Sequence, residues 1–468
     1  TNHQDKTPSS LISQPEQQNN HTKKFPPIRN IALWFLIPVL LLLFFAWQYT
    51  NESTPSAIAA IKHGKISIIG QGKINDQALF AGEYHIEQDT ILTLDSGDIL
   101  HLAKHSDIKF FNHNEILLSQ GKLKIESVSN NNIIVNGNNF SLHSNGGDLS
   151  VDLTNNQLTP VIKTGQQTLL KPVRWKPKHF WRFDSQSDRV TDSTGGATGI
   201  PALGATRVKG IIGQGAFKFD NSINARIDVG SGGGTAPATG SFSVTDGVTI
   251  EALIRPEFSG EFNEIDTIFR KDRGDDELRM LLCFQHDQGK RFLRPEGNFK
   301  ESLSFGLFIV GQGYHELKLP LDGLNGRPSL AQLSQADFHH IVASYNVKTG
   351  LKAIYINGEL LASYQYPPGS KILTGGPGQA SIGNNPAESR WATEAFAGVI
   401  DEVAFYDFAL PPLMVKKHVN NLQQGNNYFG LPENLKQLPK ELQLTLPANT
   451  DVELDPLTGL PKRSPKAY

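Results

Sequence analysis

The sequence predicts an all-β protein with a single N-terminal transmembrane helix, then a small β domain, then a β-sandwich jelly roll. Three observations lead to this fold class. Ile31–Trp47 has no charged or polar side chain, Gly64–Leu153 alternates short β-rich stretches with turn residues, and His179–Gly430 contains longer and more widely spaced β-rich stretches. The body that follows the helix should therefore contain two β domains of different size.

The apolar run is long enough to cross a membrane. With Gln48 and Tyr49 it gives a helix over residues 31–49, whose length at about 1.5 Å per residue approaches the roughly 30 Å of a bilayer core. The alternative is a cleaved signal peptide that ends at Ala57-Ile-Ala59. The long polar stretch between Trp47 and Ala59 disfavours that alternative.

Basic residues on one side of the run predict its orientation. Lys23, Lys24 and Arg29 precede it, and no basic residue follows it before Lys62. Because loops rich in Lys and Arg stay in the cytoplasm, we expect residues 1–30 to form a disordered cytoplasmic tail. The sequence thus predicts a single-pass membrane protein with a cytoplasmic N-terminus and an extracytoplasmic C-terminal body.

Composition excludes some partners. The 468 residues carry a formal net charge of −2, which gives no electrostatic reason to bind nucleic acid. Cys283 is the single cysteine, so no internal disulfide can form, and within Met280-Leu-Leu-Cys-Phe284 it is expected to be a small core residue.

Residues 57–155 form the predicted small β domain. In Lys122–Glu126 polar and apolar residues alternate strictly, as in a strand with one buried face. The order of Leu94-Asp-Ser-Gly-Asp-Ile-Leu-His-Leu, Leu117–Glu126, Asn139-Phe-Ser-Leu and Asp148–Leu153 resembles the FecR domain, the exported portion of bacterial sigma-factor regulators. The resemblance implies structural turns and no catalytic residue. It also implies a bacterial inner-membrane protein whose C-terminal body is periplasmic or otherwise extracytoplasmic.

That resemblance also implies an alternative function, transmembrane signalling to a cytoplasmic sigma-factor system. Family members that regulate sigma factors carry a helical cytoplasmic domain before the membrane segment. Residues 1–30 are too short and polar to bury such a core.

Residues 156–178 contain three prolines and predict an extended linker. The domain expected at 179–430 then opens with His179-Phe-Trp-Arg-Phe-Asp-Ser, continues through Thr249-Ile-Glu-Ala-Leu-Ile-Arg-Pro, and closes with Phe396-Ala-Gly-Val-Ile-Asp-Glu-Val-Ala-Phe-Tyr-Asp. These blocks, in this order, resemble a LamG-like, concanavalin A-like jelly roll. The resemblance implies two long antiparallel sheets, one of them concave, with Asn357-Gly358 as a hairpin turn.

Three segments of this domain are longer than strand connections require: Glu257–Glu277, His286–Lys300 and Gly311–Asp337. Long loops often carry binding function, so we predict ligand contacts there, with the concave sheet as the alternative surface. The exposed aromatic and charged groups expected to bind a glycan or protein ligand are Phe262, Phe292, Arg294 and Tyr314.

The sequence predicts no catalytic site. The concanavalin-like fold also hosts β-glucanases, whose two acids lie on one strand as Glu-x-Asp-x-x-Glu. Glu264-Ile-Asp266 begins that pattern, but Ile268 or Phe269 takes the place of the second acid. Retaining hydrolysis needs two carboxyl groups about 5 to 5.5 Å apart, so a glycan-degrading enzyme is the weakest alternative.

No metal site has convincing spacing. His339 and His340 are adjacent and should point to opposite faces of a strand. Asp401-Glu402 resembles a structural family element. The sequence predicts no cofactor with certainty, and calcium stays open as an alternative, with Asp220, Asp228 and Asp401 as acidic candidates.

Residues 431–468 repeat Leu-Pro pairs among charged residues and predict an extended or disordered tail. Taken together, these features predict a membrane-anchored, non-catalytic protein whose jelly roll binds a glycan or an extracytoplasmic protein.

Overall fold

The structure is a computed structural model that describes residues 56–128, 131–154, 159–231, 242–273, 277–286, 292–293, 300–335, 338–386, 394–431, 438–463 and 466–467. The chain divides into Thr1–Ser56 and Ala57–Tyr468, and the second unit is described below. The predicted transmembrane segment, residues 31–49, lies outside the described residues. Within the described ranges, no helix has the length and apolar character needed to span a bilayer.

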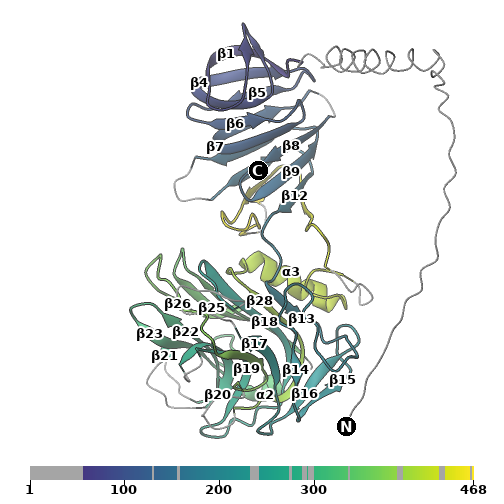
Figure 1. The fold of residues 1–468 in the computed structure, drawn as a ribbon, viewed down its shortest axis with the longest axis vertical. Helices are drawn as coiled ribbons and strands as arrows, with labels where there is room; N and C mark the ends of the chain where they lie inside the picture. The colour runs from purple at the N-terminus through teal and green to yellow at the C-terminus, as the bar shows by residue number, and fades with distance from the viewer. Residues whose placement is uncertain are drawn as a thin grey trace, which may run out of the picture. The chain divides into compact units, whose positions relative to one another are not determined.

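The first β domain is built around one antiparallel-rich sheet (Figure 1). Its two long strands, Gly82–Leu94 and Glu115–Glu126, alternate buried and exposed side chains, which confirms the strand predicted at Lys122–Glu126. Tyr84 is fully buried in its core, and its hydroxyl donates to the carbonyl of Phe80 at 2.7 Å. The strands are β1 (Ala59–Ile68), β2 (Ile74–Asn75), β3 (Ala78–Leu79), β4 (Gly82–Leu94), β5 (Ile99–Leu102), β6 (Asp107–Phe110), β7 (Glu115–Glu126), β8 (Asn132–Asn136), β9 (Phe140–Asn145), β10 (Leu149–Leu153), β11 (Val161–Thr164) and β12 (Thr168–Pro172).

The C-terminal segment returns to this same sheet. Strand β29 (Leu444–Leu446) pairs with β12, strand β30 (Thr450–Glu453) pairs with β11, and β31 (Lys466–Ala467) pairs with β30. The segments expected to be a linker (156–178) and an extended or disordered tail (431–468) thus contribute paired strands. Their strands are only two to five residues long and are interrupted by prolines, so each lacked a recognisable period by itself. The jelly roll is consequently inserted between β12 and β29.

The jelly roll consists of two sheets. We call β15-β16-β28-β18-β24-β25-β26, with β13 beside β28, the first jelly-roll sheet, and β14-β17-β27-β19-β20-β22-β23-β21 the second jelly-roll sheet. The first contains β13 (His179–Trp181), β15 (Ala205–Val208), β16 (Ala216–Asp220), β18 (Gly247–Pro256), β24 (His339–Asn346), β25 (Leu351–Ile356), β26 (Glu359–Gln365) and β28 (Ala397–Tyr406). The second contains β14 (Ile200–Pro201), β17 (Ile227–Ser231), β19 (Ile265–Asp272), β20 (Leu278–Gln285), β21 (Phe292–Leu293), β22 (Ser302–Ile309), β23 (Gly313–Pro320) and β27 (Gln379–Ile382).

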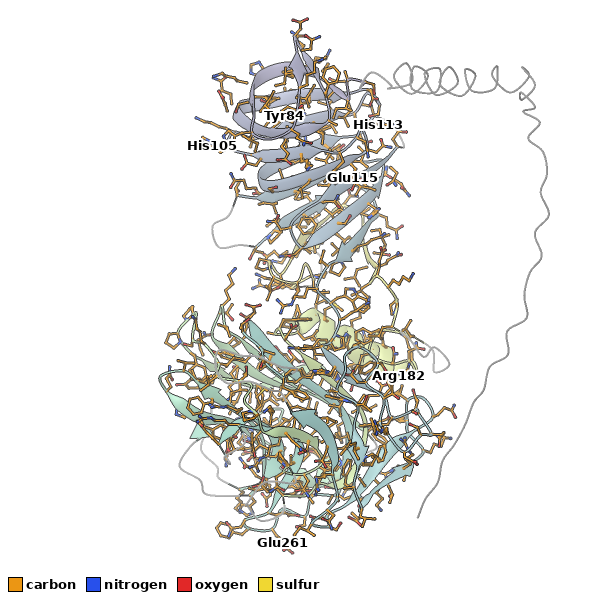
Figure 2. The ribbon with its side chains drawn as sticks, in the orientation of Figure 1. Tyr84, His105, His113, Glu115, Arg182 and Glu261 are labelled. Carbon is orange, nitrogen blue, oxygen red and sulfur yellow. The ribbon has the colours of Figure 1, made fainter. Side chains whose placement is uncertain are left out.

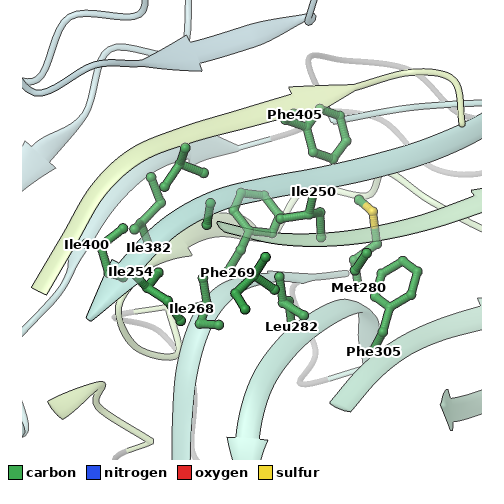
Figure 3. Packing of buried hydrophobic residues seen from close by; sticks show 14 of the residues in the cluster. Ile250, Ile254, Ile268, Phe269, Met280, Leu282, Phe305, Ile382, Ile400 and Phe405 are labelled. Atoms are coloured by element: carbon green, nitrogen blue, oxygen red, sulfur yellow. The ribbon is translucent and has the colours of Figure 1, made fainter. Parts of the chain in front are cut away.

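Apolar side chains from the two sheets meet in a continuous core (Figure 3). Ile250 and Phe405 of the first sheet face Phe269, Leu282 and neighbouring residues of the second, and all of them are fully buried. This packing holds the second sheet rigidly from its inner side. Its outer face is therefore free to carry a different set of residues.

Two short helices complete the domain. Helix α2 (Leu330–Gln335) precedes β24, and α3 (Pro412–Gln423) follows β28. The predicted hairpin turn is confirmed: Asn357 and Gly358 have φ of 51° and 84° and join β25 to β26. Positive φ at both positions suits this two-residue turn, and Asn and Gly tolerate it best.

The predicted loops Glu257–Glu277 and Gly311–Asp337 each contain an eight-residue strand. They contain β19 and β23, which lie within the second jelly-roll sheet, and α2. The prediction was wrong because both faces of β19 are buried and its outward side chains are polar, so neither alternation nor a plain apolar run marked it.

Candidate functional site

Strand register identifies the residues on the outer face of the second jelly-roll sheet. Thr267 of β19 lies opposite Cys283 of β20, which lies opposite Ser304 of β22 and, next along, Lys318 of β23. A parallel row places Arg270 opposite Leu281, Gly306 and Glu316 in turn. Because alternate residues of the same strands form the core, these two rows face outward.

Arg270 is the charged centre of this face. Its side chain is 1% exposed, and its Nε lies 2.9 Å from Asp272 Oδ1 while Nη1 bonds Glu394 Oε2. Burial raises the pKa of Glu394, against the lowering effect of Arg270. The third nitrogen, Nη2, is buried without a hydrogen-bond partner. A guanidinium group held on two sides thus presents one unsatisfied donor.

Two aliphatic hydroxyl groups on the same face, and the hydroxyl of Tyr314, are also unsatisfied. Thr267 Oγ1 and Ser304 Oγ are fully buried and have no hydrogen-bond partner. A buried hydroxyl without a partner costs about 1–3 kcal/mol. Retaining three of them beside the unsatisfied Nη2 of Arg270 is typical of a site whose partner is a ligand.

An apolar strip crosses the polar groups. Leu281, Cys283 and Tyr314 form a small cluster against which Phe308 packs. The Tyr314 ring lies over Gly306, where a Cβ atom would come within 1.8 Å of the tyrosine hydroxyl. Burial, with the charges of Glu316 and Cys283, raises the pKa of Tyr314 well above its ordinary value. The face therefore combines an aromatic ring with hydrogen-bonding groups, as sugar-binding surfaces do.

Of the four residues predicted to bind ligand, Tyr314 has its described side chain on this face, and Phe292 lies opposite Glu316 in the strand register. Phe262 is 57% exposed and contacts the His286 ring edge-on at 5.6 Å, in the turn before β19. Phe292 lies in β21, which runs parallel to β23 at the sheet edge. Arg294 lies outside the described residues. None of these placements tests ligand binding, which stays a prediction for all four.

Glu264 and Asp266 do not face a common site. Glu264 Oε2 accepts from Ser259 Oγ and the Glu261 backbone within an exposed turn, where Glu261 is labelled in Figure 2. Asp266 is fully buried and accepts from the backbone of Ala397 at 2.9 Å. Burial raises the pKa of Asp266 to about 7. Paired carboxyl groups flanking a sugar bond are not formed by these two residues.

His339 and His340 point to opposite faces of β24, as predicted. His339 Nε2 lies 3.1 Å from the carbonyl of Leu333, whereas His340 Nε2 lies 2.6 Å from Glu251 Oε1. Glu251 also bonds His418 of α3 and Tyr406, so α3 is fastened to β18 and β28 by one buried carboxylate. Burial opposes ionisation of Glu251, yet the two histidines lower its pKa to about 2.

The three calcium candidates serve separate structural purposes. Asp220 accepts from Ser222, Asp228 pairs with Arg226, and Asp401 accepts from the backbone of Ile211 and Ile212. Among the described residues, His, Cys, Asp and Glu side chains do not gather into a metal-binding group.

Sequence reasoning missed Arg270, Thr267 and Ser304. The polar residues Thr267 and Arg270 interrupt a β-rich stretch three apart, but a bulge between Thr267 and Phe269 hides the common face. Only the pairing of β19, β20 and β22 shows that Thr267 and Arg270 share a face with Ser304.

Comparisons with known proteins agree with this fold. Residues 228–416 match the family model Laminin_G_3, the concanavalin A-like lectin/glucanases superfamily. No curated protein matches the sequence.

Similar solved structures include domain 4 of a GH43 extracellular arabinanase from Geobacillus stearothermophilus in complex with arabinotriose, at 20% identity, 52% coverage of this chain, 97% of that chain and a TM-score of 0.34. The binding domain of Paraclostridial Mosquitocidal Protein 1 is 14% identical, with 52% of each chain covered and a TM-score of 0.38. The Botulinum Neurotoxin serotype G binding domain is 16% identical, with 54% of each chain covered and a TM-score of 0.36. This chain spans about half the length of the two toxin domains. Residues 228–416 thus match the model of the concanavalin A-like lectin/glucanases superfamily and lie in a domain with the two sheets of a jelly roll.

Proposed function

We propose that the jelly roll is a non-catalytic glycan-binding module whose ligand lies on the outer face of the second jelly-roll sheet. The observation that carries this proposal is that four buried polar atoms on one face have no hydrogen-bond partner: Thr267 Oγ1, Ser304 Oγ, Arg270 Nη2 and the Tyr314 hydroxyl. Sugar hydroxyls would satisfy them. Tyr314 and Leu281 supply the apolar contact for the C–H face of a sugar ring.

Solvent reaches this face through its partly exposed members. Glu316 is 13% exposed and Glu394 is 16% exposed, whereas the hydroxyls behind them are buried. To reach Thr267 and Ser304, a ligand must displace the groups that cover these two side chains. The hydrogen bonds that the ligand then makes to the two hydroxyls offset the free energy of that displacement.

We also propose that residues 31–49 anchor the protein in the bacterial inner membrane with this module outside the cytoplasm, on the strength of the apolar run and its basic flank. An anchored module would hold the cell envelope close to a glycan, or to an extracytoplasmic protein that carries one.

A glycan array probed with the full 468-residue chain tests the binding proposal, followed by titration of each positive glycan against variants. Thr267→Val and Ser304→Ala should each weaken binding about three- to tenfold, the loss expected for one hydrogen bond. Thr206→Val, which removes an exposed hydroxyl on the first jelly-roll sheet, is the matched control and should change nothing. Unchanged affinity in both site variants would move the binding surface elsewhere.

A further inference from the structure

The charges on the outer face of the second jelly-roll sheet are fully compensated. Arg270 is bound by Asp272 and Glu394, Lys318 lies 3.8 Å from Glu316, and Glu277 is shared by Arg273 and Arg279 at 3.0 and 3.2 Å. The cations of these ion pairs are Arg270, Arg273, Arg279 and Lys318, and their anions are Asp272, Glu277, Glu316 and Glu394, so the paired charges are equal in number.

In the two pairs formed by Glu394 and Glu316 the carboxylate is more exposed than its cation, whereas Arg273, next to the end of β19, is more exposed than Glu277. Arg270 is 1% exposed and its partner Glu394 is 16% exposed, while Lys318 is 6% exposed and its partner Glu316 is 13% exposed. In both pairs the carboxylate is the group nearer to solvent. An acidic ligand that approaches would meet negative charge first, in partly buried surroundings where screening is weak.

The polar atoms of this face that have no hydrogen-bond partner are suited to bind uncharged hydroxyl groups. Thr267 and Ser304 hydroxyls can each donate and accept, and Arg270 Nη2 can donate. A carboxylate or sulfate on the ligand could bind Arg270 bidentately only by displacing Glu394, whereas a hydroxyl needs no displacement.

We infer that the site selects neutral, hydroxyl-rich glycans and rejects uronic-acid or sulfated ones. This inference rests on the proposed function, because it assigns a ligand class to the same face. Glu316 is the specificity-determining group, since its carboxylate is partly exposed and accepts from Gln285 Nε2 at 2.8 Å, whereas Glu394 holds Arg270.

Calorimetric titration of the full chain at one ionic strength tests the inference with four probes. Laminarin and arabinan are the neutral probes, and polygalacturonate and heparin are the acidic ones. We expect at least tenfold tighter binding of a neutral probe than of either acidic probe, and we expect Glu316→Gln to narrow that ratio by threefold or more. Glu359→Gln, an exposed carboxylate on β26 of the first sheet, should leave the ratio unchanged.

Tighter binding of an acidic probe that Thr267→Val weakens would overturn the inference and leave the proposed function standing. The inference would also be overturned if an acidic probe binds more tightly at lower salt and its affinity does not change in Thr267→Val. Such binding would be non-specific electrostatic attraction outside this face. If no probe binds and no array glycan binds, the proposed function itself fails.

Discussion

At the residue scale, two buried threonines of the jelly roll differ in one respect. Thr249 Oγ1 donates to the carbonyl of Phe408 and accepts from the backbone of Leu410, both at 2.8 Å, whereas Thr267 Oγ1 has no partner. Both side chains are fully buried. The two threonines therefore differ in hydrogen bonding and not in burial.

This contrast predicts opposite effects of the same substitution. Thr249→Val should lower the free energy of unfolding by about 1–3 kcal/mol, because two backbone groups lose their partner. Thr267→Val should leave it unchanged or raise it by up to about 1 kcal/mol, because an unsatisfied hydroxyl is removed at constant shape. Urea unfolding measures both. Destabilisation by Thr267→Val equal to that of Thr249→Val would show that Thr267 has a structural role.

Four buried carboxyl groups predict how stability depends on pH. The pKa values of Asp192 and Glu251 are lowered to about 2, so their contributions are present above the unfolded pKa near 4 and are lost as pH falls. The pKa values of Asp266 and Asp401 are raised to about 7 by burial, so the folded state loses stability as pH rises from about 4 to 7. Stability should therefore peak at roughly pH 4–5.

Unfolding in urea at pH 4.5 and 7.5 measures this profile. Asp401→Asn should reduce the loss of stability between these values by on the order of 1–3 kcal/mol, because it cannot ionise. Asp220→Asn is the control, since the pKa of Asp220 is lowered and its ionisation does not change in this range. Equal slopes in the wild type and Asp401→Asn would contradict the assignment.

At the scale of elements, the sheet of the first β domain depends on strands from the C-terminal segment of the chain. Removing residues from Leu442 onward leaves β11 and β12 without β30 and β29. We expect backbone amides of β11 and β12 to lose most of their protection in hydrogen exchange, while amides of β18 in the jelly roll keep theirs. Removing residues 464–468 takes away β31 alone and serves as the control. Retained protection in β11 and β12 after the longer deletion would contradict the pairing.

How far the elements could be predicted depended on whether their determinants are local. Alternation at Lys122–Glu126 and the Asn357-Gly358 turn are read within a few residues, and both are confirmed. Strands β29 and β30 are defined by partners almost 300 residues away, so their sequence read as a tail. The candidate site needed the same long-range register. Tyr314 was identified for its ring, whereas Thr267 and Ser304 become notable only when strands are aligned and partners are absent.

At the scale of the whole molecule, membrane topology is the main prediction. A protease site inserted at residues 155–158, between β10 and β11, should be cut in spheroplasts without lysis, because the basic flank before Ile31 predicts a cytoplasmic N-terminus. Neutralising Lys23, Lys24 and Arg29 together should reduce the fraction of chains that are cut before lysis. Protection of the wild-type site until lysis would contradict the topology.

The return of the chain to its first sheet has a mechanical consequence. Leu169 of β12 lies opposite Thr445 of β29, so the two strands that bracket the jelly roll in sequence are hydrogen-bonded neighbours. A pull on a bound ligand would be shared by two covalent connections that enter one sheet as an antiparallel pair. Extraction would have to shear several backbone hydrogen bonds at once, whereas a module hung on a single linker would load only one strand. Such a double attachment would let the proposed binding module keep its ligand under tension.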